Sequence, residues 1–177
     1  MLFFLDSLTR LAIAQRELGL LLAGELSNRA RLRTDGQLQL LLNGRSPLSA
    51  STRARIDALS HEHCRVFHVQ ADCADRPALT AALAPVLAQS GPIDGLIHAA
   101  GLQASGSVLA SSPEAFAAVL NAKIGATQVL DQVLAEQPLA LICHFSSSSA
   151  LLGDMGACSY AMANRFQQAY ARYVQRG

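Results

Sequence analysis

Short apolar runs alternate with longer helical patterns along this chain, and that alternation restricts its fold more than any other feature. LQLLL at 38–42 and CRVFHV at 64–69 are short and end at polar or glycine residues, and similar runs occupy about 95–98 and 139–145. Apolar runs of this length are typical of strands that are buried on both faces in a parallel sheet. An LFFL run near the N-terminus predicts a further short strand.

Helical patterns separate these runs. Recurring leucines predict one helix within 8–31 and another over about 76–89. A shorter helix is expected to begin after Ser49 or Ser51, either of which can cap it, and one long helix is expected from about 113 to 134. This order predicts an α/β fold in which helices cover both faces of a parallel sheet through right-handed crossovers.

Composition narrows the class of protein. With 177 residues, 51% of them hydrophobic, the chain can bury one substantial core, so a single domain over 1–177 is expected. A net charge of +1 gives no electrostatic reason to expect a nucleic acid or a membrane surface as partner. The opening MLFFLDSLTR lacks the basic start of a secretory signal, and the four cysteines lack zinc or disulfide spacing. We therefore expect a cytoplasmic protein without a metal site.

Candidate ligand-binding residues follow the predicted strands. Arg45 comes after the strand at 38–42, Asp72 after the next, Ala99 to Gly101 after the third and Ser147 after the last. The carboxyl ends of parallel strands meet at one edge of a sheet, and ligands of open α/β folds bind there. The sequence therefore predicts that these residues gather at one binding edge.

The segment 145–166 carries the clearest candidate for catalysis. Tyr160 and Asn164 lie four residues apart in a helical pattern and so share one helix face. A tyrosine acts as an acid or base near neutral pH only if its pKa, about 10, falls by about three units, or about 4 kcal/mol. One ammonium about 4 Å away can supply on the order of 4 kcal/mol. Lys123 is the chain's only lysine, and Ser147 could hydrogen-bond a substrate carbonyl.

These spacings and motifs resemble the short-chain dehydrogenase/reductase superfamily and, within it, the ketoreductase domains of modular polyketide synthases. The resemblance is strong over 38–177 and weak over 1–37. Its motifs are NGRSPLS (43–49), QADCAD (70–75), GPIDGLIHAAG (91–101), FAAVLNAKIGA (116–126), FSS (145–147) and YAMANRFQQAYA (160–171).

The resemblance implies a Rossmann-like, doubly wound parallel sheet that is incomplete at its C-terminal end. It also implies NADPH-dependent reduction of a β-keto group to a β-hydroxy group on an acyl chain carried by an acyl carrier protein, beside neighbouring polyketide synthase domains. In this reading Tyr160 donates the proton and Ser147 polarises the carbonyl. Lys123 supports the tyrosine and holds the ribose, and Asn164 supports a proton relay.

The same resemblance assigns the cofactor contacts. Arg45 would face the 2′-phosphate, which favours NADPH over NADH because no carboxylate ends that strand to take the ribose hydroxyls. Asp72 and Cys73 would contact the adenine, and the small residues Ala99, Ala100 and Gly101 would let the cofactor lie against the backbone. Taken singly, each residue also fits an ordinary role in a loop, a turn or the core. His98 and His144 are expected to pack rather than to catalyse.

The sequence departs from the family pattern in two places, of which the first favours an inactive remnant and the second leaves the product configuration undetermined. AIAQREL at 12–18, with Glu17, stands where a glycine-rich phosphate turn is expected, and an alignment on Gly24 is no better. Gln103-Ala104-Ser105 and Leu152 replace the residues that mark product configuration. The alternatives are an inactive ketoreductase remnant that braces neighbouring synthase domains and a free-standing reductase of a small ketone.

Overall fold

Five parallel strands form the sheet in the computed structural model, which describes residues 2–6, 13–32, 37–102, 111–153 and 155–175. The strand order is β3-β2-β1-β4-β5, so the chain winds outward in both directions from β1. The predicted α/β class with a parallel sheet is confirmed. The strands are β1 (Leu2–Asp6), β2 (Leu38–Gly44), β3 (Cys64–Gln70), β4 (Gly95–His98) and β5 (Leu141–His144).

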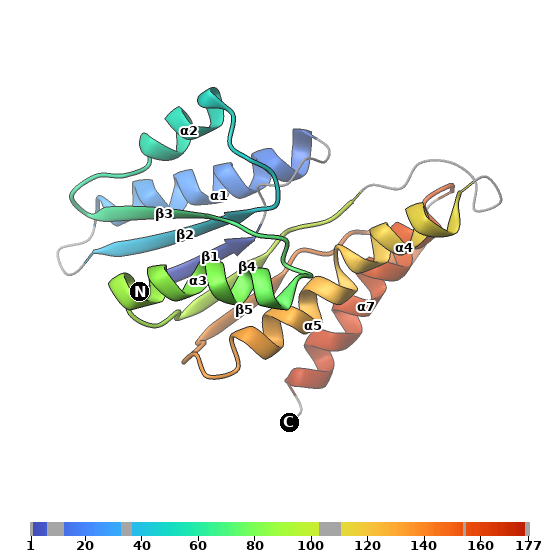
Figure 1. The fold of residues 1–177 in the computed structure, drawn as a ribbon. Coiled ribbons are helices and arrows are strands. Elements are labelled where there is room, and N and C mark those ends of the chain that lie inside the picture. The colour runs from blue at the N-terminus through green and yellow to red at the C-terminus, as the bar shows by residue number, and fades with distance from the viewer. Residues whose placement is uncertain (1, 7–12, 33–36, 103–110, 154, 176–177) are drawn as a thin grey trace.

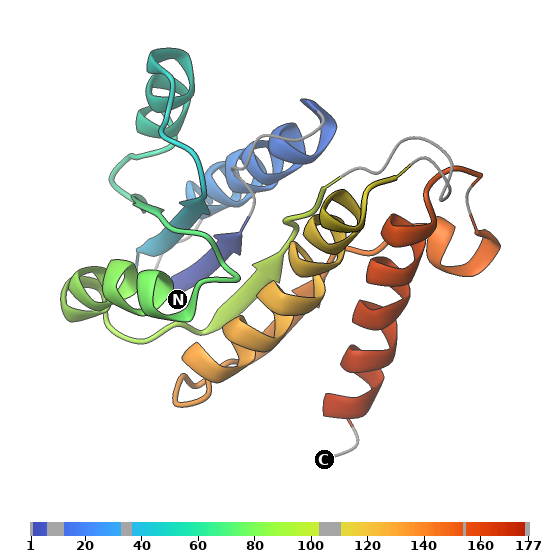
Figure 2. The ribbon, with the colours of Figure 1, turned by 45° about the vertical axis from the view of Figure 1, so that its right-hand side comes forward.

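Helices cover both faces of this sheet (Figures 1 and 2). α1 and α2 lie on one face, and α3, α5 and α7 lie on the other, with α5 and α7 side by side in both views. The helices are α1 (Ile13–Ala30), α2 (Ala50–Asp57), α3 (Arg76–Ser90), α4 (Pro113–Asn121), α5 (Ile124–Val133), α6 (Ser149–Leu152) and α7 (Cys158–Val174).

The leucine run of β2 fills the core on both sides of the sheet. Successive side chains of a strand point to opposite faces. Leu40 and Leu42 accordingly join the buried cluster under α1 and α2, whereas Leu41 joins the cluster under α3 and α5. All three are at most 1% exposed. This two-sided burial explains why the strand reads as a continuous apolar run rather than an alternating one.

Side-chain caps set the starts of three helices. Ser49, rather than Ser51, caps α2, because its Oγ accepts a hydrogen bond from the Thr52 amide at 3.1 Å. Asp75 caps α3 in the same way, and Ser112 caps α4. A cap of this kind contributes about 1 kcal/mol.

The single long helix expected over 113–134 is wrong, because the chain breaks it into α4 and α5 at Lys123. The Lys123 amide donates to the Leu120 carbonyl at 3.1 Å, three residues back, and its own carbonyl accepts from the Thr127 amide as α5 begins. A Cβ added at Gly125 would collide with the side-chain oxygen of Asn121. A glycine therefore permits the close approach of α4 and α5 at this break.

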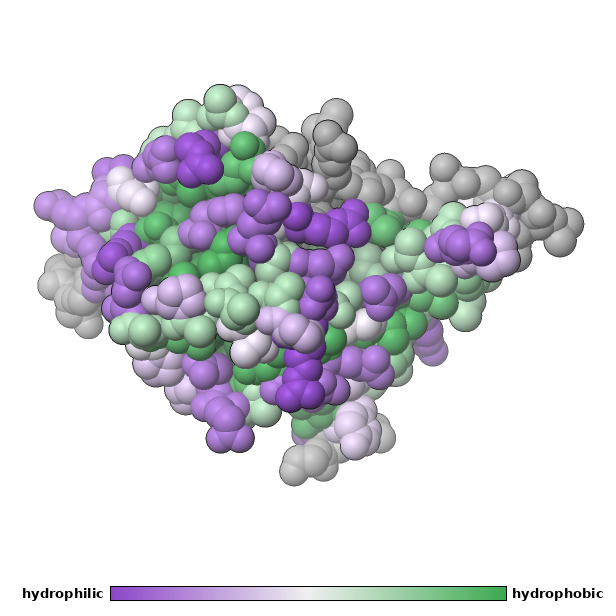
Figure 3. Space-filling view, in the orientation of Figure 1, coloured by the Kyte–Doolittle hydropathy of each residue, from purple (hydrophilic) through white to green (hydrophobic). Residues whose placement is uncertain are grey.

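The described helices do not suit a bilayer. On the face seen in Figure 3, hydrophilic residues are interspersed among apolar ones, without a continuous apolar belt. In the part of the chain that the structure describes, every helix is too short or too polar to cross a membrane.

Histidines at the ends of β4 and β5 and a tyrosine of α7 form a cluster of aromatic rings. The His98 and His144 rings meet edge to face, with centroids 5.8 Å apart, and His144 also meets Tyr170 edge to face. Burial, and then electrostatic interactions with His98 and Lys123, lower the pKa of His144 to about 4, against an opposing effect of Asp131. The imidazole is therefore neutral in the fold at neutral pH.

This burial predicts a specific sensitivity to acid. The pKa of His144 is 6.5 in the unfolded chain and about 4 in the fold. Above about pH 6.5 the imidazole is neutral in both states and does not lower the free energy of unfolding. As the pH drops from 6.5 toward 4, the unfolded chain binds a proton that the fold does not, so the free energy of unfolding falls. His144→Gln should remove about 1–2 kcal/mol of that loss, allowing for partial exposure of the imidazole. Urea unfolding of both chains at pH 7.0, 5.5 and 4.5 measures this. His63→Gln controls for the loss of an imidazole in a loop, and an equal fall in stability for wild type and His144→Gln would contradict the assignment.

Candidate active site

α7 holds Tyr160 and Asn164 on one face, as their spacing predicts. Asn164 is completely buried, and its Nδ2 donates to the Tyr160 carbonyl at 2.8 Å. The Ser146 hydroxyl donates to the Asn164 carbonyl at 3.2 Å and so ties the segment after β5 to α7. Tyr160 itself is half-buried. A hydrogen bond therefore joins α7, the tyrosine helix, directly to the serine segment, residues 145–149.

Ser147 lies two residues beyond the last bond of the sheet. The Phe145 amide donates to the His98 carbonyl at 3.0 Å, so pairing with β4 continues just past the end of β5. The Ser147 Oγ accepts from the Ser149 amide at 3.2 Å, which holds the hydroxyl at the start of α6. Its oxygen keeps a proton to donate, and the side chain remains half-buried.

Lys123 connects these segments from the break between α4 and α5. Its side chain is 1% exposed. Its Nζ donates to the Phe145 carbonyl at 2.8 Å and to the Gln167 Oε1 at 2.9 Å. The lysine segment, the serine segment and the tyrosine helix thus meet around one buried ammonium.

Gln167 and Thr127 are site residues that the sequence reasoning missed. The Gln167 Nε2 donates to the Thr127 Oγ1 at 3.4 Å, and both residues are buried. A signal for Gln167 was present, because it lies seven residues after Tyr160 and three after Asn164, on the same helix face.

Five of the six predicted cofactor residues line one cavity of about 110 Å³ at the carboxyl ends of the strands. Its walls also include the end of α4, so the cavity borders the segment that carries Lys123. The sixth predicted residue, Ala99, is buried and does not line the cavity, whereas its neighbour Ala100 does. The five lining residues are Arg45, Asp72, Cys73, Ala100 and Gly101.

Arg45 reaches across this cavity toward Asp72. The Arg45 Nη1 lies 3.8 Å from the Asp72 Oδ2, and both side chains are more than 40% exposed. An ion pair this exposed contributes at most about 1 kcal/mol, so a phosphate can compete for the guanidinium. The other Asp72 oxygen, Oδ1, accepts from the Ala74 amide at 2.9 Å, so the carboxylate also shapes the turn.

The segments in which this chain departs from the family pattern are only partly described by the structure. Gln103-Ala104-Ser105 lies outside the described residues, as does the whole connection from β1 to α1, and AIAQREL lies within α1 from Ile13 onward. Gly24 lies inside α1, where an added Cβ would meet Leu59 at an ordinary 3.9 Å. That glycine therefore belongs to helix packing. Leu152 ends α6 and is 86% exposed.

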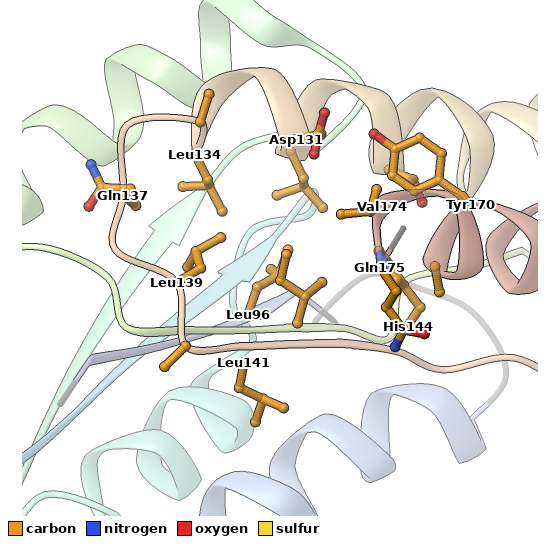
Figure 4. A pocket seen from close by; sticks show the side chains of 16 residues that line it. Leu96, Asp131, Leu134, Gln137, Leu139, Leu141, His144, Tyr170, Val174 and Gln175 are labelled. Carbon is orange, nitrogen blue, oxygen red and sulfur yellow. The ribbon is translucent and has the colours of Figure 1, made fainter. Parts of the chain in front are cut away.

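A larger cavity of about 430 Å³ lies between α5, α7 and the strands β4 and β5 (Figure 4). Asp131, His144 and Tyr170 contribute titratable groups to a lining that is otherwise mostly apolar. Burial and a hydrogen bond to Asp131 raise the pKa of Tyr170 to about 12. With His144 at about 4, neither group exchanges a proton readily near pH 7. We therefore place the candidate active site at Tyr160 and Lys123 rather than at the larger cavity.

Comparisons with known proteins agree on one family. A family model described as the KR domain matches residues 17–177. Polyketide synthase PksM of Bacillus subtilis (strain 168) is 38% identical over 134 residues, which is 76% of this chain and 3% of that protein. A crystal structure of a ketoreductase domain from the bacillaene assembly line matches with a TM-score of 0.85 and 30% identity, over 99% of this chain and 39% of that chain.

A more distant structure shows the same fold. A 3-oxoacyl-(acyl-carrier protein) reductase from Brucella melitensis matches with a TM-score of 0.76 and 22% identity, over 96% of this chain and 66% of that one. The chain spans about 3% of the length of the PksM synthase. Because the family model covers nearly the whole chain, this protein belongs to the KR domain family, the ketoreductases of polyketide synthases.

Proposed function

We propose that this chain is a ketoreductase domain, or a large piece of one, that uses NADPH to reduce the β-keto group of an acyl chain tethered to a carrier protein. It would act in the cytoplasm beside neighbouring polyketide synthase domains. One observation carries the proposal. The buried Lys123 ammonium bonds at once to the carbonyl at the start of the serine segment and to the helix that bears Tyr160 and Asn164.

Each polar group of the site has a role in this reaction. NADPH, when bound, supplies a hydride to the carbonyl carbon. Tyr160 donates a proton to the carbonyl oxygen, and the Ser147 hydroxyl hydrogen-bonds the same oxygen as negative charge develops on it. Lys123 places a positive charge beside the tyrosine and holds the cofactor ribose. The Asn164 Oδ1 is buried and accepts no hydrogen bond from the described residues, which suits a water-mediated relay that resupplies the proton.

The cavity residues fit the proposed cofactor. The amide of Asn43, near the end of β2, donates to the Ala71 carbonyl and to the Cys73 sulfur, so that strand end offers a neutral, occupied group instead of a carboxylate. Arg45 follows it and lies in the cavity wall. A guanidinium without a carboxylate at this strand end favours a 2′-phosphate over free ribose hydroxyls.

An inactive remnant is the second candidate. In sequence, AIAQREL aligns with the glycine-rich phosphate turn but offers bulky side chains instead of glycines, and from Ile13 onward it lies within α1 rather than in a turn. In that case the domain would brace its neighbours without turnover.

Replacing the proposed proton donor should remove most activity. In any form of the protein that reduces a ketone, Tyr160→Phe should lower kcat about 100-fold or more, because the proton donor is lost while the ring is kept. Steady-state kinetics with circular dichroism as a check on folding measure this. Tyr173→Phe is the matched control, since that tyrosine is 75% exposed on the same helix. A Tyr160→Phe protein with nearly normal kcat would disprove the role.

Arg45 should distinguish the two dinucleotides. Loss of a charged phosphate contact costs about 2 kcal/mol, or about thirtyfold in affinity, so Arg45→Ala should weaken NADPH far more than NADH. Calorimetric titration of both cofactors into each variant tests this. Arg65→Ala, at the opposite end of the strands, should change neither affinity. Equal weakening of both cofactors by Arg45→Ala would show that Arg45 does not recognise the 2′-phosphate.

The isolated chain should separate the enzyme from the remnant. Residues 1–177 alone should bind NADPH weakly or not at all and reduce no ketone, because the tetrad orients the reacting groups but does not anchor the pyrophosphate. Fluorescence titration with NADPH measures the affinity, with a KR domain of known NADPH binding as positive control. A micromolar dissociation constant would reject the remnant and would mean that other groups hold the phosphates.

A further inference from the structure

The Lys123 ammonium is held in the interior by neutral oxygens. At 1% exposure its charge is nearly removed from water. Burial of this kind favours the neutral amine, whereas each hydrogen bond donated by the ammonium favours the charged form. Two such bonds run to the Phe145 carbonyl and to the Gln167 side chain. These two acceptors are neutral oxygens, and each stabilises the charged form of the amine.

The Gln167 amide can lie in only one of its two orientations. Its nitrogen donates to the Thr127 hydroxyl, and its oxygen accepts from Lys123. A flipped amide would turn its NH₂ group toward the ammonium and set two donors against each other. Lys123 and Thr127 lie four residues apart, one helical turn, at the start of α5, so α5 contacts both ends of the same amide.

Gln167 also links the ammonium to the proposed proton donor. Tyr160, Asn164 and Gln167 occupy positions i, i+4 and i+7 of α7 and therefore share one face. A rigid helix thus carries both the tyrosine and the oxygen that locates the lysine charge. A substitution at Gln167 would therefore act on the lysine from the helix that carries Tyr160.

We propose that Gln167 is a positioning residue for the ketoreductase reaction, which keeps the buried Lys123 amine protonated and fixes it relative to Tyr160. This rests on the proposed function for its importance to catalysis, but the effect on Lys123 is a property of the free chain. Of these two acceptors, the Phe145 carbonyl belongs to the backbone, so Gln167 is the one that a side-chain substitution removes.

Other titratable groups belong to the elements around this lysine. His144 from β5 interacts with it electrostatically, and His98 from β4 packs on His144. Tyr160 shares a face of α7 with Gln167. Because the pKa of His144 lies at about 4, that imidazole stays neutral through the range in which a lysine titrates. Changes in Lys123 titration between variants can therefore be compared without protonation of His144.

The single lysine makes the experiment direct. An untagged chain of residues 1–177 grown with ¹³C,¹⁵N-lysine contains one labelled side chain. The ¹³Cε chemical shift, followed from pH 6 to 12 without cofactor or ketone, reports the midpoint at which Lys123 loses its proton. Gln167→Met keeps the length of the side chain but removes the acceptor, and it should lower the midpoint by about one pH unit. Gln167→Glu should raise it.

Gln168→Met is the matched control. Gln168 is the next residue on α7, and its Oε1 accepts no hydrogen bond from the described residues, so the same replacement takes no acceptor from Lys123. In the Gln168→Met chain, Lys123 should therefore lose its proton at the same midpoint pH as in the wild type. A folded Gln167→Met chain that titrates like the wild type would overturn the proposal.

A further variant keeps the test decisive if Gln167→Met fails to fold by circular dichroism. Thr127→Val removes the hydroxyl that orients the Gln167 amide and should lower the midpoint by a smaller amount. Unchanged midpoints in both Thr127→Val and Gln167→Glu would reject the role. Because no turnover is measured, an inactive chain with the expected midpoints would reject the proposed function and leave the Lys123–Gln167 coupling intact.

Discussion

A buried ammonium organises the centre of this protein. Lys123 is among the largest fully buried side chains, and a charge in such surroundings is costly unless hydrogen bonds satisfy it. The Phe145 carbonyl and Gln167 supply those bonds from the end of β5 and from α7. The break between α4 and α5 occurs at the lysine itself. Satisfying one charge therefore holds two helices and a strand end in a fixed arrangement.

The same break joins the lysine to the proposed cofactor site. Asn121 and Ala122 line the smaller cavity, and Lys123 is the next residue. The opposite wall comes from the segments that follow β2, β3 and β4, which the parallel sheet brings to one edge. One short interruption in a helix thus places the lysine between the proposed cofactor cavity and the helix that carries Tyr160.

Much of the fold could be predicted because it depends on local periodicity and on burial. The leucines of β2 and the cap at Ser49 are local signals, and the structure follows both. The break at Lys123 was missed because apolar residues keep their helical spacing on both sides of it. Gln167 was missed because a glutamine in a helix resembles any solvated surface residue until its neighbours are known.

The amino-acid sequence by itself determined the alternation of strands and helices, the single lysine, and the shared face of Tyr160 and Asn164, since these follow from residue type and helical period. Only the tertiary structure decided that Lys123 is buried against Gln167, that Arg45 lies near Asp72, and that Tyr170 lies beside a carboxylate. These contacts join residues 27 or more positions apart, and hydrogen bonds, desolvation and charge depend on distance in space rather than along the chain.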